Sequence, residues 1–309
     1  MKIDEKYMVR ALQLARNGEG RVSPNPMVGA VIVSNDKIIG EGFHAFHGGP
    51  HAEVNAINSV NPEDRHRLRD STMYVTLEPC AHHGKTPPCA DLIVNTGIHR
   101  VVVGTTDPNP LVAGKGIRIL EEAGIEVIKG CLEQECKNIN VRFIKAQQSE
   151  FPWIILKWAQ SADGYIAAFN NEEPVSVKFS SPLSLIWMHR ERANTDAIIV
   201  GANTQRIDTP ALNVRFWGGN SPEKFVASGN FNCVNFAKDL RKRGFISLMV
   251  EGGQKLLNSF LQAGLYDEIR IETAPFDIEK GLAAPSLPSG LRLINTRHSG
   301  NNLILTYRR

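Results

Sequence analysis

The sequence predicts an α/β protein made of two domains. Its 309 residues suggest two domains at roughly 150 residues each. Apolar stretches of strand length alternate with amphipathic helical stretches in both halves, and the segment Ser149–Pro152 interrupts the alternation between them. We therefore expect one domain over residues 1–149 and a second over residues 150–309.

The elements of the first half follow from hydrophobic periodicity and from turn residues. Asn35 and Asp36 supply hairpin turn chemistry between two apolar runs, and glycines stop several helices. Strands that alternate with helices in this way imply a mostly parallel sheet with covered faces. We expect helix 4–17, strands 28–33 and 37–42, helix 51–60, strand 73–77, helix 90–96, strand 100–104, helix 115–123, strand 125–128 and helix 132–148.

The second half restarts the alternation after the break. Its apolar runs are short enough for buried strands, and the stretches between them have helical periodicity. This pattern predicts a second α/β domain. Its expected strands are 153–158, 197–200, 246–250 and 268–273, and its expected helices are 183–193, 235–243 and 255–263.

Composition excludes several classes of protein. Hydrophobic residues make up 42% of the chain and charged residues 22%, which is ordinary for a globular protein. A net charge of +3 is too small to indicate a nucleic-acid or membrane partner. No apolar run reaches the length of about 18 residues that a membrane helix needs, and the N-terminus has no apolar secretion signal. Because the five cysteines are odd in number, we expect a cytoplasmic protein with reduced thiols.

The strongest functional signal is a set of metal-ligand residues. His51 is followed by Glu53, and Pro79 precedes Cys80, with Cys89 further along the chain. One imidazole and two thiolates form a three-ligand set, and catalytic zinc sites combine three protein ligands with an open position for water. Cys89 precedes a helical run, whose N-terminus favours the thiolate. We therefore predict that His51, Cys80 and Cys89 bind Zn²⁺.

Glu53 is the expected catalytic residue beside this metal. It can stay outside the ligand set and act as a general acid/base that deprotonates water and protonates a leaving amine. The pattern matches the His-x-Glu and Pro-Cys signature of zinc nucleobase deaminases. His44 and His47 are rival ligands, although neither has a Glu two residues later, and Cys131 with Cys136 could form a second metal pair.

The residues between the two zinc-ligand cysteines narrow the choice of family. Residues 78–89 read Glu-Pro-Cys-Ala-His-His-Gly-Lys-Thr-Pro-Pro-Cys, so that eight residues separate the cysteines. Most nucleic-acid and nucleoside deaminases have two there. Together with Ser23–Ala30, Asp107–Pro110 and 114–116, this stretch resembles the bifunctional riboflavin-biosynthesis deaminase/reductase family over nearly the whole chain. The resemblance implies a cytidine-deaminase-like three-layer sandwich followed by a dihydrofolate-reductase-like α/β domain.

In that family the first domain deaminates a diaminopyrimidinone that carries a phosphoribosylamino group. The resemblance therefore implies a small pyrimidine phosphoriboside as the substrate. Lys85 and Thr86 suit phosphate or ribose oxygens, and Asn25 suits a base edge. Asn25 and Asn109 also flank prolines and could serve as turn residues alone. The residues that the resemblance places at this substrate are Asn25, His44, His82, Lys85, Thr86, Asp107 and Asn109.

Residues 156–164 resemble the opening of the family's reductase domain, which reduces the ribose of the deaminated product to ribityl with NADPH. Glycine-bearing turns follow strands at Gly201–Thr204 and Glu251–Gly253, and such turns suit a close approach to phosphate, although a plain turn would look the same. By resemblance the substrate side comprises Lys157, Asp208, Arg215 and Glu251. The expected NADPH side comprises Ser161, Gly201, Thr204, Gly252 and Gly253.

Two features of the second half depart from the family pattern. The family usually carries Trp-Ile-Thr-Ser before the first long helix, whereas this chain has Lys178-Phe179-Ser180-Ser181. Family members also place more residues, including a strand and a helix beside the cofactor, where this chain has the shortened segment 216–244. An alternative is therefore an active deaminase whose second domain is a scaffold that stabilises or oligomerises it.

Two further interpretations remain open. A polynucleotide deaminase would need a basic groove with aromatic residues, whereas this chain is nearly neutral and 7% aromatic. A structural zinc module would need a fourth protein ligand, such as His82 or His83. The leading interpretation is a cytoplasmic homo-oligomeric enzyme that deaminates with Zn²⁺ and then reduces with NADPH. We expect it to have no nucleic-acid or membrane partner.

Overall fold

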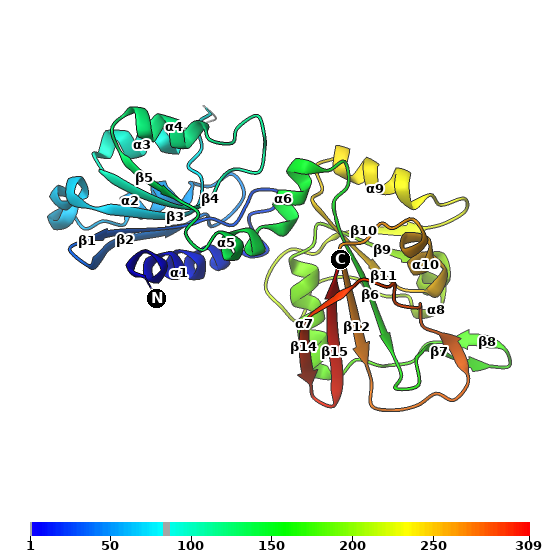
Figure 1. Ribbon diagram of the computed structural model, residues 1–309. Helices are drawn as coiled ribbons and strands as arrows, with labels where there is room; N and C mark the ends of the chain where they lie inside the picture. The colour runs from blue at the N-terminus through cyan, green and yellow to red at the C-terminus, as the bar shows by residue number, and fades with distance from the viewer. Residues whose placement is uncertain (1, 83–86) are drawn as a thin grey trace. The chain divides into compact units, whose positions relative to one another are not determined.

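The computed structural model describes residues 2–82 and 87–309 of the chain. Two compact units divide the molecule, residues 1–148 and residues 149–309. Each unit has a central sheet with helices packed on it (Figure 1). Within the described ranges, the helices are too short or too polar to cross a membrane.

Unit 1 is built on a five-stranded sheet of described residues with the order β2-β1-β3-β4-β5. β1 pairs antiparallel with β2 and β3, whereas β3, β4 and β5 pair in parallel, so β1 runs against the other four. Asn35 and Asp36 connect β1 to β2 as a tight turn, and both have the positive φ that such a turn requires. The strands are β1 Gly29–Ser34, β2 Lys37–Phe43, β3 Thr72–Leu77, β4 Arg100–Thr105 and β5 Glu126–Lys129.

Helices cover both faces of this sheet, which makes unit 1 a three-layer sandwich (Figure 1). Residues of α2, α3 and α4 pack into one core, and residues of α1 and α5 pack into the other. The helices are α1 Ile3–Ala15, α2 Ala52–Asn58, α3 Cys89–Thr96, α4 Lys115–Glu122, α5 Glu133–Ile139 and α6 Val141–Gln148, with 3-10 turns at Arg16–Gly18 and Pro62–Asp70.

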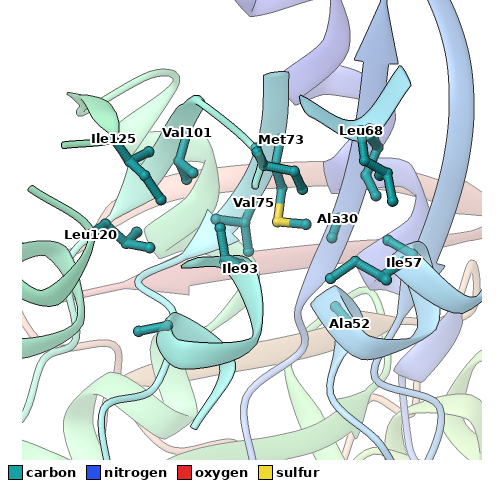
Figure 2. Packing of buried hydrophobic residues seen from close by; sticks show 14 of the residues in the cluster. Ala30, Ala52, Ile57, Leu68, Met73, Val75, Ile93, Val101, Leu120 and Ile125 are labelled. Atoms are coloured by element: carbon teal, nitrogen blue, oxygen red, sulfur yellow. The ribbon is translucent and has the colours of Figure 1, made fainter. Parts of the chain in front are cut away.

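Successive side chains of the strands point alternately to the two faces of the sheet, and this produces the two cores. Met73 and Val75 of β3 face the core that contains α2 and α3, as Figure 2 shows, whereas Tyr74 between them belongs to the opposite core. Val101 and Val102 of β4 divide between the two cores in the same way. Successive side chains of a strand point to opposite faces, so a wholly apolar strand serves both layers.

The single helix expected over residues 132–148 is wrong, because the structure breaks it at Asn140. The Asn140 side chain accepts a hydrogen bond from the Met27 backbone N–H at 2.8 Å and donates one to the Met27 carbonyl at 2.9 Å. These two hydrogen bonds connect Asn140 to a segment more than 100 residues earlier in the chain. The hydrophobic periodicity of residues 132–148 reports only on neighbouring residues and cannot reveal a contact with Met27. The sequence therefore predicted one helix where α5 and α6 form.

Unit 2 contains a seven-stranded sheet of described residues in the order β10-β9-β11-β6-β12-β15-β14. The pairs from β10 to β12 are parallel, and a C-terminal antiparallel hairpin completes the sheet. Its strands are β6 Trp153–Gln160, β9 Ala197–Gly201, β10 Glu223–Ala227, β11 Ser247–Glu251, β12 Glu268–Thr273, β14 Arg292–Ser299 and β15 Asn302–Arg308. A small separate sheet is formed by β7 Tyr165–Asn170, β8 Glu173–Val175 and β13 Gly281–Ala283.

Helices flank the large sheet of unit 2 as well (Figure 1). Residues of α9 and α10 join its main hydrophobic core. The shortened segment 216–244 contains α9, which confirms the helix expected over 235–243, and also β10, a strand that the sequence pattern did not predict. The helices are α7 Pro182–Ala193, α8 Ala202–Asp208, α9 Cys233–Lys242 and α10 Gln254–Gln262.

Candidate functional site

Three different elements of unit 1 bring the expected zinc ligands together. His51 is the residue immediately before α2, Cys80 follows β3, and Cys89 is the first residue of α3. The ligand atoms of the three residues all lie within 4.8 Å of one another. His51 Nδ1 is 3.5 Å from Cys80 Sγ and 3.3 Å from Cys89 Sγ. These distances allow one small ion to contact all three side chains.

The start of α3 prepares the Cys80 thiol to bind a cation. The Cys89 backbone N–H donates to Cys80 Sγ at 3.3 Å, and the Ala90 N–H donates to the Cys80 carbonyl at 3.2 Å. Hydrogen bonds from Cys89 and His51 outweigh burial and hold the pKa of the Cys80 thiol well below its ordinary value. Zinc binds the thiolate, and one nitrogen with two sulfurs is a donor set that it prefers. The residues present therefore fit Zn²⁺.

Glu53 lies in the first turn of α2, two residues after His51. Its side chain is only 3% exposed. Burial raises the pKa of the Glu53 carboxyl to about 7; Cys80 beside it adds to the increase, and the charge of His51 opposes it. A carboxyl group with a pKa near neutrality can both accept and return a proton, which is what a general acid/base must do.

His44 and Asn25 form a hydrogen-bonded pair beside the zinc ligands. The His44 Nδ1 atom is 2.9 Å from the Pro50 carbonyl, and a carbonyl can only accept, so Nδ1 carries the proton. The His44 Nε2 atom then accepts from Asn25 Nδ2 at 3.1 Å. The His44 ring also packs against the His51 ring edge-on, with centroids 5.5 Å apart. The amide oxygen of Asn25 can accept a further hydrogen bond.

The other residues expected at the deaminase substrate lie in three places. Asp107 follows β4, is half-buried, and has its pKa raised by burial, with Cys80 and His82 among the groups that influence it. Asn109 caps the next turn, where its Oδ1 accepts from the Leu111 N–H at 3.0 Å. His82 is exposed. Lys85 and Thr86, and His83 as a possible fourth ligand, lie outside the described residues.

Unit 2 contains a cavity of about 760 Å³, which is a size typical of small-molecule sites. The cavity lies where β6, β9 and β11 end, beside the turns that follow two of these strands. Phe179 also lines it, in the stretch that lacks the family's tryptophan. The expected residues that line it are Lys157, Asp208, Glu251, Gly201, Thr204, Gly252 and Gly253.

The two glycine turns contact each other at this cavity. The Thr204 hydroxyl accepts from the Gly253 N–H at 2.9 Å, and a Cβ on Gly252 would lie 3.0 Å from the same hydroxyl oxygen. Gly252 also has a φ of +130°, which only glycine adopts readily. This crowded glycine cradle brings backbone atoms to the cavity surface, and a cradle of this kind fits the phosphates of a dinucleotide such as NADPH.

Charged groups converge where β6 and β11 reach the cavity. Lys157 of β6 and Glu251 of β11 are register partners in the sheet. Glu251 is buried and forms an ion pair with Arg192, whose Nη2 lies 2.6 Å from Glu251 Oε2. Burial alone would raise the pKa of Glu251, but Arg192 and Lys157 outweigh it and keep the carboxyl ionised.

Two expected residues of unit 2 lie away from the described cavity lining. The Ser161 hydroxyl is buried in the turn after β6, where it bonds to Asp163 and Tyr165. Arg215 is exposed, and its backbone N–H donates to His189 Nδ1 at 2.9 Å. The structure therefore gives Ser161 a turn-forming contact and leaves Arg215 beside α7.

Sequence reasoning missed Arg192, His189 and Glu78. Arg192 and His189 sit on α7, which gave no sign that charged residues would be buried. Glu78 stands directly before the Pro-Cys pair, and its buried carboxylate accepts from backbone N–H groups of a distant loop. Its place in the quoted motif was a signal that could have found it.

Comparison with known sequences identifies both halves. A sequence profile for the cytidine and deoxycytidylate deaminase zinc-binding region matches residues 1–105. A profile for the RibD C-terminal domain matches residues 152–237 and 230–293. The riboflavin biosynthesis protein RibD of Aquifex aeolicus is 36% identical, and the alignment covers 100% of this chain and 99% of that protein. RibD of Bacillus amyloliquefaciens is 37% identical over 93% of this chain and 88% of its own length.

Solved structures agree over the same length. RibD of Acinetobacter baumannii superposes with a TM-score of 0.88 at 31% identity, covering 99% of this chain and 98% of that one. A diaminohydroxyphosphoribosylaminopyrimidine deaminase/5-amino-6-(5-phosphoribosylamino)uracil reductase of Thermotoga maritima gives a TM-score of 0.88 at 34% identity, with the same coverage. The chain therefore belongs to the RibD family of riboflavin biosynthesis proteins, bifunctional enzymes that join a zinc-binding deaminase domain to an NADPH-dependent reductase domain.

Proposed function

We propose that residues 1–149 deaminate 2,5-diamino-6-(5-phosphoribosylamino)pyrimidin-4(3H)-one and that residues 150–309 reduce the ribose of the product to ribityl. In the first reaction water replaces the amino group on a ring carbon, which leaves a carbonyl and releases ammonia. The observation that carries this proposal is the convergence of His51, Cys80 and Cys89 beside the buried carboxyl of Glu53.

Each residue of the first site has a distinct task in this proposal. His51, Cys80 and Cys89 would hold zinc, which when bound supplies a Lewis acid that makes water nucleophilic near neutral pH. Glu53 accepts a proton from the attacking water at its carboxylate and returns it to the departing amine. The oxygen of Asn25, fixed by the hydrogen bond between its amide nitrogen and His44, accepts from the pyrimidine. His82, Lys85, Thr86, Asp107 and Asn109 complete the proposed substrate contacts.

The second reaction adds a hydride to the ring-opened carbon of the ribose and a proton to the heteroatom that is double-bonded to it. NADPH, when bound, supplies the hydride. Gly201, Thr204, Gly252 and Gly253 would hold its phosphates, because they form the glycine cradle of the cavity. Lys157, Asp208 and Glu251 line the same cavity and would contact the substrate, with the Lys157 ammonium suited to its phosphate and the two carboxylates suited to its hydroxyl groups. The positions of Ser161 and Arg215 give less support to their proposed contacts.

The scaffold alternative predicts a second unit without a working cavity. The 760 Å³ cavity, its glycine cradle and the ion-paired Glu251 favour an active reductase instead. The test supplies the diamino substrate and measures ammonia release, and then supplies the deaminated product and measures NADPH oxidation. Ammonia without NADPH oxidation at any enzyme concentration would support the scaffold and overturn the reductase assignment.

We further propose a homo-oligomer located in the cytoplasm. The described cysteines are all free thiols, which suits a reducing compartment. Exposed apolar side chains on α7 and β14, among them Leu183, Ile186 and Leu293, offer a surface for self-association. Light scattering at several protein concentrations tests the oligomer, which a constant monomer mass would contradict.

A further inference from the structure

We propose that Glu78 is a positioning residue for the deaminase, which fixes the loop 107–116 against the segment that carries Cys80. This inference rests on the proposed deaminase function of unit 1. The loop 107–116 runs from the end of β4 into α4 and contains Asp107 and Asn109. Glu78 lies between the end of β3 and Cys80, and it is 6% exposed.

The Glu78 carboxylate binds both ends of the loop at once. Its Oε2 atom accepts from the backbone N–H groups of Asp107 and Gly114, each at 3.0 Å. Its Oε1 atom accepts from Gly116 at 3.0 Å and from Ile117 at 3.4 Å. One side chain therefore satisfies four backbone donors that belong to the loop and to the first turn of α4.

Backbone contacts make this connection rigid. The Glu78 N–H donates to the Thr105 carbonyl at 2.9 Å, so the residue is held to the end of β4. A Cβ on Gly116 would lie 1.9 Å from the carbonyl oxygen of Pro79, so the start of α4 rests directly on the peptide before Cys80. A displacement of the loop 107–116 would therefore change its distance from the zinc-ligand segment.

The chemistry of the site requires a carboxylate. An ionised carboxylate only accepts hydrogen bonds and has about four lone-pair positions for them. A glutamine in the same place would turn an NH₂ group toward two backbone N–H donors, which would leave both of them unpaired in a buried site. The loop would then move, whereas His51, Cys89 and Glu53 do not take part in the hydrogen bonds of Glu78 described above and would stay in place.

Steady-state kinetics of variants of the full-length zinc enzyme test this inference, because an effect on KM can be distinguished from an effect on kcat. For Glu78→Gln we expect a KM for the diamino substrate raised about tenfold or more, with kcat, zinc content and the reductase activity of the same chain retained. Glu78→Asp keeps the carboxylate on a shorter side chain and should recover part of the loss. Glu122→Gln, an exposed substitution at the end of α4, is the matched control and should leave KM unchanged.

Three outcomes would overturn the inference. An unchanged KM in folded Glu78→Gln would show that the loop does not depend on the carboxylate. Parallel loss of zinc and kcat would show that Glu78 supports the metal site or the fold of unit 1 rather than the loop. If Glu78→Gln fails to fold, an unchanged KM in Glu78→Asp decides against the inference. Absence of ammonia release by the unmodified enzyme would instead reject the proposed function itself.

Discussion

Two buried glutamates near the zinc ligands have different surroundings. Glu78 accepts hydrogen bonds from four backbone N–H groups, which commits its carboxylate to holding structure. Glu53 is equally buried, and its burial raises the pKa of its carboxyl to about 7. The oxygens of Glu78 are occupied by backbone donors, whereas a carboxyl with a pKa near neutrality, as in Glu53, can exchange a proton. In the proposed mechanism the same residue type thus serves positioning at one place and proton transfer at the other.

If Glu53 is the general acid/base, its substitution should abolish deamination without affecting zinc binding. Glu53→Gln keeps the shape of the side chain and lies outside the ligand set, so we expect zinc content to be retained. Ammonia release should fall by about 100-fold or more, because general acid/base catalysis is lost. Metal analysis together with an ammonia assay checks both parts. Full activity of this variant would refute the assigned role.

His189 predicts a pH dependence of stability. The side chain is fully buried, its Nδ1 accepts from the Arg215 N–H, and burial lowers its pKa from 6.5 to about 4. The unfolded chain takes up a proton at this residue below about pH 6.5, whereas the folded chain stays neutral until about pH 4. The stabilising contribution is therefore complete above pH 6.5 and is lost progressively as the pH falls to about 4.

Urea unfolding across this pH range checks the prediction. The free energy of unfolding should decrease more between neutral pH and pH 4 in the natural protein than in His189→Gln, which can still accept from the Arg215 N–H. Equal pH slopes for the two proteins would contradict it.

Among the elements, α2 lies unusually close to β2 because the strand carries glycine where the helix crosses. A Cβ on Gly42 would lie 2.3 Å from the Ala56 nitrogen and 2.5 Å from the Ala52 carbonyl oxygen. Because α2 carries Glu53 and begins directly after His51, the packing of α2 against β2 sets the position of both residues. Strand packing thus determines the geometry of the metal centre.

Gly42→Ala should push α2 away from the sheet. We expect a loss of stability of about 1–3 kcal/mol in unit 1, which overpacking typically costs, together with weaker zinc binding and lower deaminase activity. NADPH oxidation by unit 2 should not change. Gly218→Ala is the control, because a Cβ there meets no atom within 4 Å. Retained zinc affinity in Gly42→Ala would show that α2 does not depend on this contact.

The sequence predicted the buried elements more successfully than the exposed ones. Strands such as Ala197–Gly201 are apolar on both faces and were found within one residue of their ends. The strand Arg292–Ser299 is mostly exposed and the strand Glu173–Val175 is very short, so neither had an apolar pattern to reveal it. The break at Asn140 depends on Met27, and a local pattern cannot contain that contact.

In the whole molecule, each unit contains its own candidate site. The zinc ligands and Glu53 could be found from sequence because their spacing reflects the chemistry of the metal. The partners of Glu251 could not, since Lys157 reaches it through strand pairing and Arg192 through the packing of α7. Motifs therefore predicted the chemistry, whereas the tertiary fold determined which charged groups meet.

Selective removal of zinc tests the central claim most directly. The enzyme is treated with a chelator, and ammonia release from the diamino substrate and NADPH oxidation with the deaminated product are measured before and after zinc is restored. We expect chelation to abolish ammonia release, zinc to restore it, and NADPH oxidation to be unaffected throughout. Ammonia release that continues after the zinc has been removed would contradict the account.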